Sequence, residues 1–243
     1  MGLPTTTDEP RVHRYPWHGH FPDVVIHASE SAVKQHPMYA AAKAGDYASA
    51  LALVSEALSD AATATIARLA EGTAPILMSV HAEERDGLNA IPQVVAAVLA
   101  HRLGWSVDTT VVQSNIVNHT GADGFSRLAR QALFDGRVMA GTYVLVDDFI
   151  GQGGTFANLR GHLMHQGASV LCATVLTGKP HSARLHQTAE DLAILRAKHG
   201  QLEVWWSQQF GFGFDCLTAS ETRYLIQTPT TERIRERVTA AWG

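Results

Sequence analysis

One segment constrains the fold of this chain more than any other, the run YVLVDDFIGQGGT at Tyr143–Thr155. Its apolar start predicts a buried strand over Tyr143–Asp147, and a second carboxylate, Asp148, follows directly. Glycines come next, and a helix is predicted to begin at Thr155-Phe156. A strand that ends in polar residues and turns at once into a helix is typical of open parallel sheets, where ligands bind beyond the carboxyl ends of the strands.

The turn of this segment has the chemistry of a phosphate site. Its glycines let the backbone approach an anion and point amide groups at it, and the start of a helix carries a partial positive charge. Thr155 is expected to cap the helix and to donate its hydroxyl to the same phosphate. Asp147 and Asp148 would repel a phosphate at short range, so we expect them to accept hydrogen bonds from the hydroxyls of a sugar. The alternative is a generic strand, turn and helix with a capping aspartate.

The surrounding chain alternates apolar strands with helical stretches from Ala74 onward, which is typical of a parallel sheet. The expected strands are Asp23–His27, Pro75–Val80, Asp108–Gln113, Tyr143–Asp147 and Ser169–Leu176. The expected helices of the sheet region are Ala90–Leu103, Phe125–Leu133 and Phe156–His165. The fold class is therefore predicted as α/β, a parallel sheet flanked by helices. We expect an N-terminal arm and helical lobe over 1–73, a core over 74–180 and a mixed C-terminal appendage over 181–243, with no clean boundary between them.

Composition narrows the classes of function. The chain has 19 basic and 23 acidic residues and a net charge of −4, so it lacks the basic surplus that nucleic-acid binders commonly carry. The longest apolar run, Val94–Ala100, is too short to span a membrane. Two cysteines, Cys172 and Cys216, are too few for a disulfide framework. With no secretory signal at the start, the expected location is cytoplasmic.

The Tyr143–Thr155 segment resembles the ribose-phosphate motif of type I phosphoribosyltransferases, in which apolar residues, two acids and a Thr-Gly-Gly-Thr-like turn follow one another. The residues that match are the apolar strand and Asp147, Asp148, Phe149, Ile150, Gly153, Gly154 and Thr155. Gln152 stands where the family usually has threonine, and Gly151 leaves no carboxylate to act on a purine ring. The resemblance covers roughly Ala74–Leu176.

The resemblance implies a transferase that uses 5-phosphoribosyl 1-pyrophosphate and Mg²⁺ and exchanges pyrophosphate for a nitrogen base, such as a nucleobase. Asp147 and Asp148 would be the catalytic residues, holding the ribose hydroxyls. The ribose 5-phosphate would lie on Gly151, Gln152, Gly153, Gly154 and Thr155. The metal would be held mainly through the ligand, with Asp147 and Asp148 as its protein contacts.

The family also carries two loops beyond this motif. A pyrophosphate loop after the first core strand would include Val80, His81 and Arg85, although the neighbouring Glu83 and Glu84 favour an ordinary solvated loop. Gly87-Leu88-Asn89 follows in an order similar to that of competence-type (ComF-like) members. A mobile loop would include His119, with Arg127 on the helix after it.

Three alternatives stay open at this point. The chain is a phosphoribosyltransferase, a non-catalytic regulator that binds a ribose phosphate or nucleotide as a signal, or a hydrolase of another sugar phosphate. The expected partners are the sugar diphosphate and a small nucleophile, with no nucleic acid and no membrane. By analogy of fold, a homodimer is expected.

Overall fold

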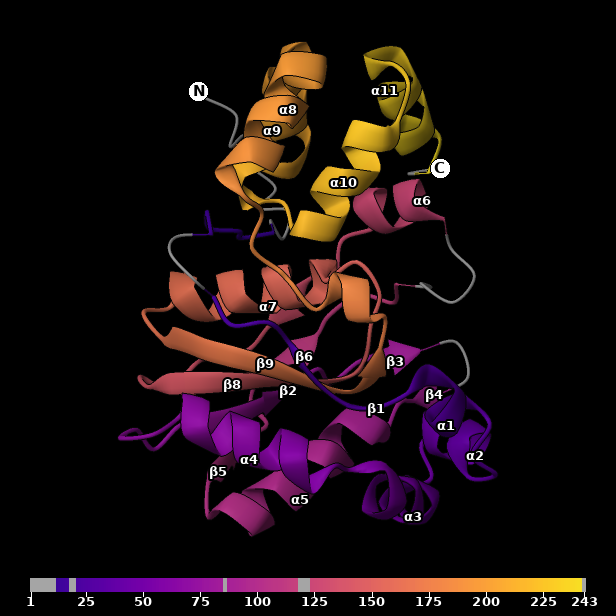
Figure 1. Ribbon diagram of the computed structural model, residues 1–243, viewed down its shortest axis with the longest axis vertical. Coiled ribbons are helices and arrows are strands. Elements are labelled where there is room, and N and C mark those ends of the chain that lie inside the picture. Colours follow the sequence, from indigo (N-terminus) through magenta and orange to yellow (C-terminus); the bar gives the residue numbers. More distant parts are fainter. Residues whose placement is uncertain (1–11, 18–20, 85–86, 118–122, 242–243) are drawn as a thin grey trace, which may run out of the picture.

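The computed structural model describes residues 12–17, 21–84, 87–117 and 123–241. A central sheet lies between two layers of helices, and a helical lobe covers the upper layer (Figure 1). Within the described residues no single helix is long and apolar enough to cross a membrane, although the bent pair α3 (Tyr47–Ala57) and α4 (Asp60–Leu69) together pass that test of length and composition.

The central sheet has five strands, and every neighbouring pair is parallel. In spatial order they are β1 (Val25–Ala28), β9 (Ser169–Gly178), β8 (Thr142–Ile150), β2 (Ile76–Ser79) and β5 (Ser106–Asp108). Because all five run the same way, their carboxyl ends meet at one edge. The prediction of an α/β fold with a parallel sheet flanked by helices is confirmed.

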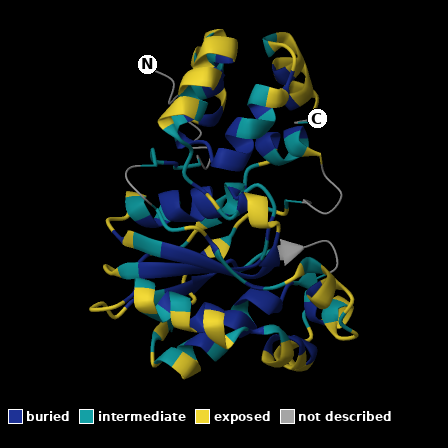
Figure 2. Ribbon diagram, viewed as in Figure 1, coloured by how far each residue is buried: buried dark blue, intermediate teal, exposed yellow. Residues whose placement is uncertain are grey.

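The two faces of the sheet bury different side chains, as the alternation along its strands requires. Leu77, Val144 and Val146 face the lower core with α3, α4 and α5 (Ile91–Leu103), whereas Met78 and Leu145 face the upper core with α7 (Gly154–His165). Figure 2 shows these strands as the most continuously buried part of the molecule.

The order of the strands reverses between β2 and β8. From β2 the chain crosses through α5 below the sheet to β5, whereas from β8 it crosses through α7 above the sheet to β9 (Figure 1). The two connections therefore diverge from adjacent strands and leave a crevice at their carboxyl ends. In open α/β sheets this is the place where ligands bind.

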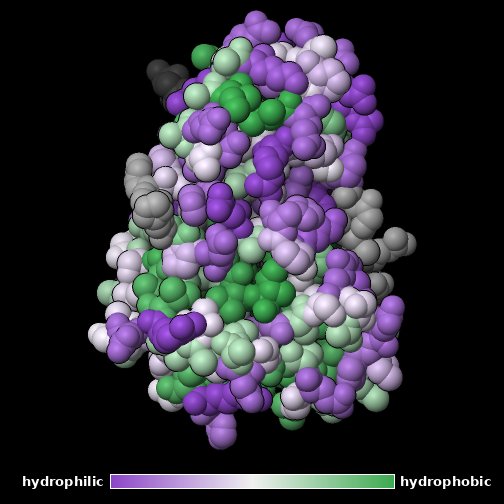
Figure 3. All heavy atoms as spheres, viewed as in Figure 1, coloured by the Kyte–Doolittle hydropathy of each residue, from purple (hydrophilic) through white to green (hydrophobic). Residues whose placement is uncertain are grey.

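The upper lobe is built from segments far apart in sequence. It contains α6 (Gly124–Ala129), α8 (Ala189–His199), α9 (Glu203–Phe210), α10 (Ala219–Gln227) and α11 (Thr231–Ala240). Its core includes Trp206, Phe210, Phe212 and Phe214, which are all buried. On the face shown in Figure 3 the surface of the lobe is mostly hydrophilic around one hydrophobic patch, and further hydrophobic residues gather lower down, nearer the sheet.

Two short helices and two small hairpins complete the described chain. They are α1 (Glu30–Lys34), α2 (Tyr39–Lys43), the pair β3 (Glu83–Glu84) and β4 (Gly87–Leu88), and the pair β6 (Val112–Gln113) and β7 (Phe134–Asp135). Short 3₁₀ turns lie at Pro180–Ser182, Gly200–Leu202 and Phe214–Cys216. In Figure 1, α1, α2, β3 and β4 lie at the same end of the sheet as the strand carboxyl ends.

The expected strand Asp108–Gln113 is wrong as a single element. β5 ends at Asp108 because the carboxylate of Asp108 accepts hydrogen bonds from the amide and the hydroxyl of Thr110, at 2.9 and 2.6 Å. The chain turns there and leaves the sheet. Val112 and Gln113 then pair with β7 in a separate antiparallel hairpin.

Candidate active site

Strand β8 carries Asp147 and Asp148 into the crevice. The strand continues to Ile150, so Asp148 lies within it together with Asp147 and does not follow its end as expected. Both residues are nearly buried, at 8% and 9% exposure. The amide of Asp148 donates to Oδ1 of Asp147 at 2.8 Å.

The two carboxylates have different surroundings. Burial, reinforced by the charge of Asp148, raises the pKa of Asp147 well above its usual range. Asp148 forms an ion pair with Lys43 of α2, whose Nζ lies 3.0 Å from Oδ2. Asp147 therefore holds a proton more readily than an ordinary aspartate, whereas Asp148 has a cation beside it. Oxygens of either carboxyl group can accept a hydrogen bond from a sugar hydroxyl.

The turn after β8 leads directly into α7. Gly153 is the residue before the helix, and it adopts a left-handed conformation with φ +83°, which favours glycine. The expectation that Thr155 caps the helix is wrong, because Thr155 already lies within the first helical turn and the capping position is held by Gly153, which has no side chain to accept a hydrogen bond. The first amide groups of a helix have no partner inside it. These amides are therefore left for an external acceptor.

Groups from distant elements surround the turn closely. A Cβ built at Gly151 would lie 2.2 Å from Nη1 of Arg127, and one at Gly154 would lie 2.7 Å from Oε1 of Glu221. At Gly153 it would lie 2.4 Å from the Leu185 side chain. The glycines thus allow these neighbours to approach, and a larger residue would displace them. Arg127 brings positive charge to the turn, as a phosphate site requires.

Gln152 stands in the turn at the position where the resemblance led us to expect threonine. Its backbone carbonyl accepts a hydrogen bond from the Thr218 hydroxyl at 2.6 Å, which fixes the turn against α10. Its side-chain Oε1 is buried and has no hydrogen-bond partner among the described residues. A buried acceptor without a partner is costly, so this position suits a ligand that supplies a donor.

The structure places two of the three residues that were predicted to bind pyrophosphate after β2. Val80 is buried, and its amide donates to the Val146 carbonyl at 2.8 Å, so it extends the pairing of β2 with β8. The His81 ring contacts the Gln93 amide of α5, and its backbone carbonyl accepts from Gln113 at 2.8 Å. These two residues are therefore at the crevice. Arg85 and His119 lie outside the described residues.

Two basic residues were missed by the sequence reasoning. Lys43 reaches Asp148 from more than a hundred positions earlier in the chain. Arg14 is buried over the start of α7, where it pairs with Glu221 at 2.7 Å, binds Asn158 at 2.6 Å and contacts the Gly154 carbonyl at 3.5 Å. Neither lies in a recognisable motif, because tertiary packing alone brings them to the site.

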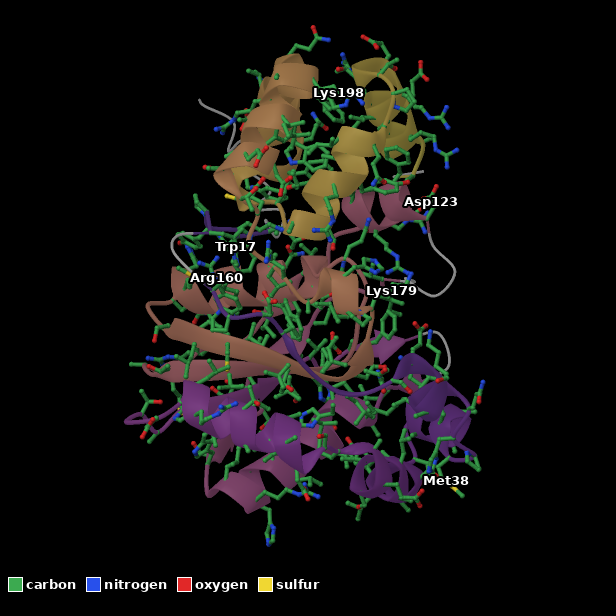
Figure 4. The ribbon with its side chains drawn as sticks, in the orientation of Figure 1. Trp17, Met38, Asp123, Arg160, Lys179 and Lys198 are labelled. Carbon is green, nitrogen blue, oxygen red and sulfur yellow. The ribbon has the colours of Figure 1, made fainter. Side chains whose placement is uncertain are left out.

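The arm that carries Arg14 runs across α7 and is held by further contacts. The Arg160 guanidinium lies 4.4 Å from the centre of the Trp17 ring (Figure 4), and the Arg160 side chain also donates to the Tyr15 carbonyl at 3.0 Å. The same figure places Lys179 just beyond β9. The start of α7 is thus enclosed by the arm on one side and by α10 on the other.

The donor set suits Mg²⁺ in a limited way. Carboxylate oxygens are ligands that Mg²⁺ takes readily, but this ion keeps many of its other ligands from water and phosphate. Among the residues that the structure describes, no group of three or more His, Cys, Asp or Glu side chains gathers to hold a metal. The residues therefore fit a Mg²⁺ ion that is bound mainly by the oxygens of a ligand and touches the protein through Asp147 or Asp148.

Comparison with known proteins gives relatives by sequence. The chain is 39% identical to "Protein TraN" of Escherichia coli over 233 residues, which is 95% of this chain and 52% of the relative. It is 37% identical to an uncharacterized protein of Haemophilus influenzae over 154 residues, which is 63% of this chain and 34% of that protein. The chain thus spans about half of the first relative and a third of the second. No family model matches it.

Solved structures give a weaker likeness. A crystal structure of adenine phosphoribosyltransferase aligns with 62% of this chain and 75% of its own, with a TM-score of 0.36 and 14% identity. Adenine phosphoribosyltransferase from Leishmania donovani aligns with 63% of this chain and 58% of its own, with a TM-score of 0.34 and 14% identity. The similarity by sequence to Protein TraN therefore extends over much more of the chain than the structural likeness.

Proposed function

We propose that this chain is a phosphoribosyltransferase that binds 5-phosphoribosyl 1-pyrophosphate at the carboxyl ends of β2 and β8. One observation carries the proposal: the uncapped start of α7 follows, through a left-handed Gly153, directly on a strand that holds Asp147 and Asp148 at the point of strand-order reversal. Backbone amides that can donate to an anion and two carboxylates that can bind hydroxyls thus follow one another within a single strand, turn and helix.

Each part of the ligand has a counterpart in this site. The 5-phosphate would accept hydrogen bonds from the amides of 151–155, with the Arg127 guanidinium beside them. The 2- and 3-hydroxyls of the ribose would contact Asp147 and Asp148. The C1 substituent would then point toward Val80 and His81, at the end of the neighbouring strand β2.

The chemistry asked of the protein is mainly positioning and charge stabilisation. Displacement of pyrophosphate from C1 by a nitrogen nucleophile passes through a sugar with developing positive charge, and a fixed carboxylate such as Asp148 stabilises that charge. Holding both reactants in line supplies much of the remaining rate. When bound, Mg²⁺ would neutralise the leaving pyrophosphate. Cytoplasmic location and assembly as a homodimer are part of the same proposal.

The test is an assay of pyrophosphate release from 5-phosphoribosyl 1-pyrophosphate with Mg²⁺ and a panel of nucleobases. We expect release that depends on one base and falls by at least a hundredfold in the double variant Asp147→Asn/Asp148→Asn. Asp60→Asn, on the exposed side of α4, is the matched control and should keep full activity. Full activity in the double variant would refute the assignment.

A regulator is the second candidate, and Gln152 favours it. The amide side chain stands in place of a hydroxyl, and its buried Oε1 has no partner among the described residues. Such a turn would still bind a ligand, but an amide group and not a hydroxyl would contact the phosphate. Tight binding of the sugar diphosphate with no pyrophosphate release with any base would support the regulator over the enzyme.

A further inference from the structure

The charged side chains of the loop after β2 are mostly acidic, which disfavours binding of an anion. Between His81 and Asn89 it has one basic residue, Arg85, against the three acidic residues Glu83, Glu84 and Asp86. The proposed ligand carries a pyrophosphate at C1, which would lie next to this loop. The acidic residues of the loop thus outnumber its one arginine, and a cation from a neighbouring element would favour binding of that group.

The end of α2 packs directly on this loop. The Ala90 amide donates to the Ala42 carbonyl at 3.2 Å. A Cβ built at Gly45 would lie 3.0 Å from the Leu88 carbonyl oxygen, and one at Gly87 would lie 2.9 Å from that of Ala44. Both glycines have positive φ, so the close approach of the two backbones depends on them. The backbone around Lys43 is thus fixed against the loop after β2.

Lys43 crosses from this position to the acidic pair. Its Nζ lies 3.0 Å from Oδ2 of Asp148, and both side chains keep some exposure, 22% for Lys43 and 12% for Asp148. The pair is therefore not fully enclosed, unlike the Arg14–Glu221 pair, whose side chains are only 1% and 2% exposed. A lysine on a flexible stem can therefore exchange one anionic partner for another without leaving the site.

We propose that Lys43 binds the pyrophosphate of the sugar diphosphate and adds positive charge beside a loop whose acidic residues outnumber its one arginine. This inference rests on the proposed function. Without ligand, Lys43 neutralises Asp148. With ligand, Asp148 accepts the ribose hydroxyls and the Lys43 ammonium moves to the phosphate oxygens at C1. No covalent bond to Lys43 is formed or broken.

The experiment compares two ligands by calorimetric titration with Mg²⁺: 5-phosphoribosyl 1-pyrophosphate, and ribose 5-phosphate, which lacks the C1 pyrophosphate. We expect Lys43→Ala to weaken binding of the first at least tenfold and to leave binding of the second within threefold of the wild type, or tighter. Lys43→Arg should restore most of the lost affinity. Lys34→Ala is the matched control, because Lys34 lies on α1 beside the ring of Phe149 and pairs with Glu30.

The outcomes separate this inference from the proposed function. Equal weakening of both ligands in Lys43→Ala, or no change in either, would overturn the role of Lys43 while leaving the sugar phosphate site in place. The same weakening in Lys34→Ala would reduce the effect to general surface charge and would also overturn it. If the wild-type protein binds neither ligand, the proposed function itself fails, and the role of Lys43 fails with it.

Discussion

Arg14 and Glu221 form an ion pair that is almost completely enclosed, with side-chain exposures of 1% and 2%. The pair joins the N-terminal arm to α10 across the first turn of α7. Removing one partner of a buried pair leaves an uncompensated charge, which typically costs about 3–5 kcal/mol. We therefore expect Arg14→Ala to lower the free energy of unfolding by that amount in urea titrations.

Asp60 offers the comparison for this prediction. It pairs with Arg102 at 2.8 Å, but its side chain is 95% exposed. Exposed pairs contribute about 0–1 kcal/mol, so Asp60→Asn should leave the free energy of unfolding nearly unchanged. Equal losses in Arg14→Ala and Asp60→Asn would show that the arm is not held by a buried charge.

His27 of β1 makes stability depend on pH. Burial lowers its pKa from the ordinary 6.5 to about 4. The unfolded chain therefore binds more protons than the folded protein between these values, so stability falls as pH decreases from about 6.5 to 4. A shift of this size corresponds to a loss on the order of 3 kcal/mol.

The variant His27→Leu should remove this dependence. The raised pKa of Asp147 has the opposite effect, because it favours the folded protein at low pH. This contribution is the same in the wild type and in the variant, so it cancels when their free energies of unfolding are compared. We expect urea unfolding at pH 7 and pH 4.5 to show a smaller loss on acidification in His27→Leu than in the wild type. Identical losses would mean that the His27 ring is protonated in the folded protein as easily as in water.

At the scale of elements, the segment from β8 to α7 was largely predictable, because its apolar run, carboxylates and glycines are consecutive. Its details were not. β8 extends through both aspartates because it pairs with β9 as far as Ile150, and Gly153 replaces Thr155 at the helix start. Lys43, Arg14 and Thr218 come from other elements, and no local pattern marks a residue that only tertiary packing brings into place.

Helix α7 also depends on a glycine in its middle. A Cβ at Gly161 would lie 1.7 Å from the His13 carbonyl oxygen and 3.1 Å from Cα of Arg14. Glycine to alanine normally stabilises a helix by up to about 1 kcal/mol, but here the arm would have to move away. We expect Gly161→Ala to destabilise the protein by about 1–3 kcal/mol in thermal or urea unfolding.

Gly200 is the matched position for that substitution. Its backbone is right-handed, with φ −58°, and the nearest atom to an added Cβ is Arg196 Cβ at 3.9 Å. Gly200→Ala should be neutral or stabilise by up to about 1 kcal/mol. A neutral result at Gly161 as well would contradict the close packing of the arm on α7.

At the scale of the whole molecule, N-terminal segments pack against the middle and the C-terminal part of the chain. β1 joins the sheet next to β9, and the arm over 12–17 lies against α7 and the upper lobe. The parallel sheet followed from the alternation of strands and helices. The placement of these N-terminal parts did not, because pairing at a sheet edge leaves no spacing signal in the sequence.

The carboxyl ends of β2 and β8 are proposed to form a site for a sugar phosphate. The most direct measurement is a calorimetric titration of 5-phosphoribosyl 1-pyrophosphate with Mg²⁺ into the wild-type protein and into Asp148→Asn, with the melting temperature of each recorded. We expect saturable binding to the wild type and loss of binding in a variant that remains folded. Absence of binding to the wild type at millimolar ligand, or equal binding to Asp148→Asn, would contradict it.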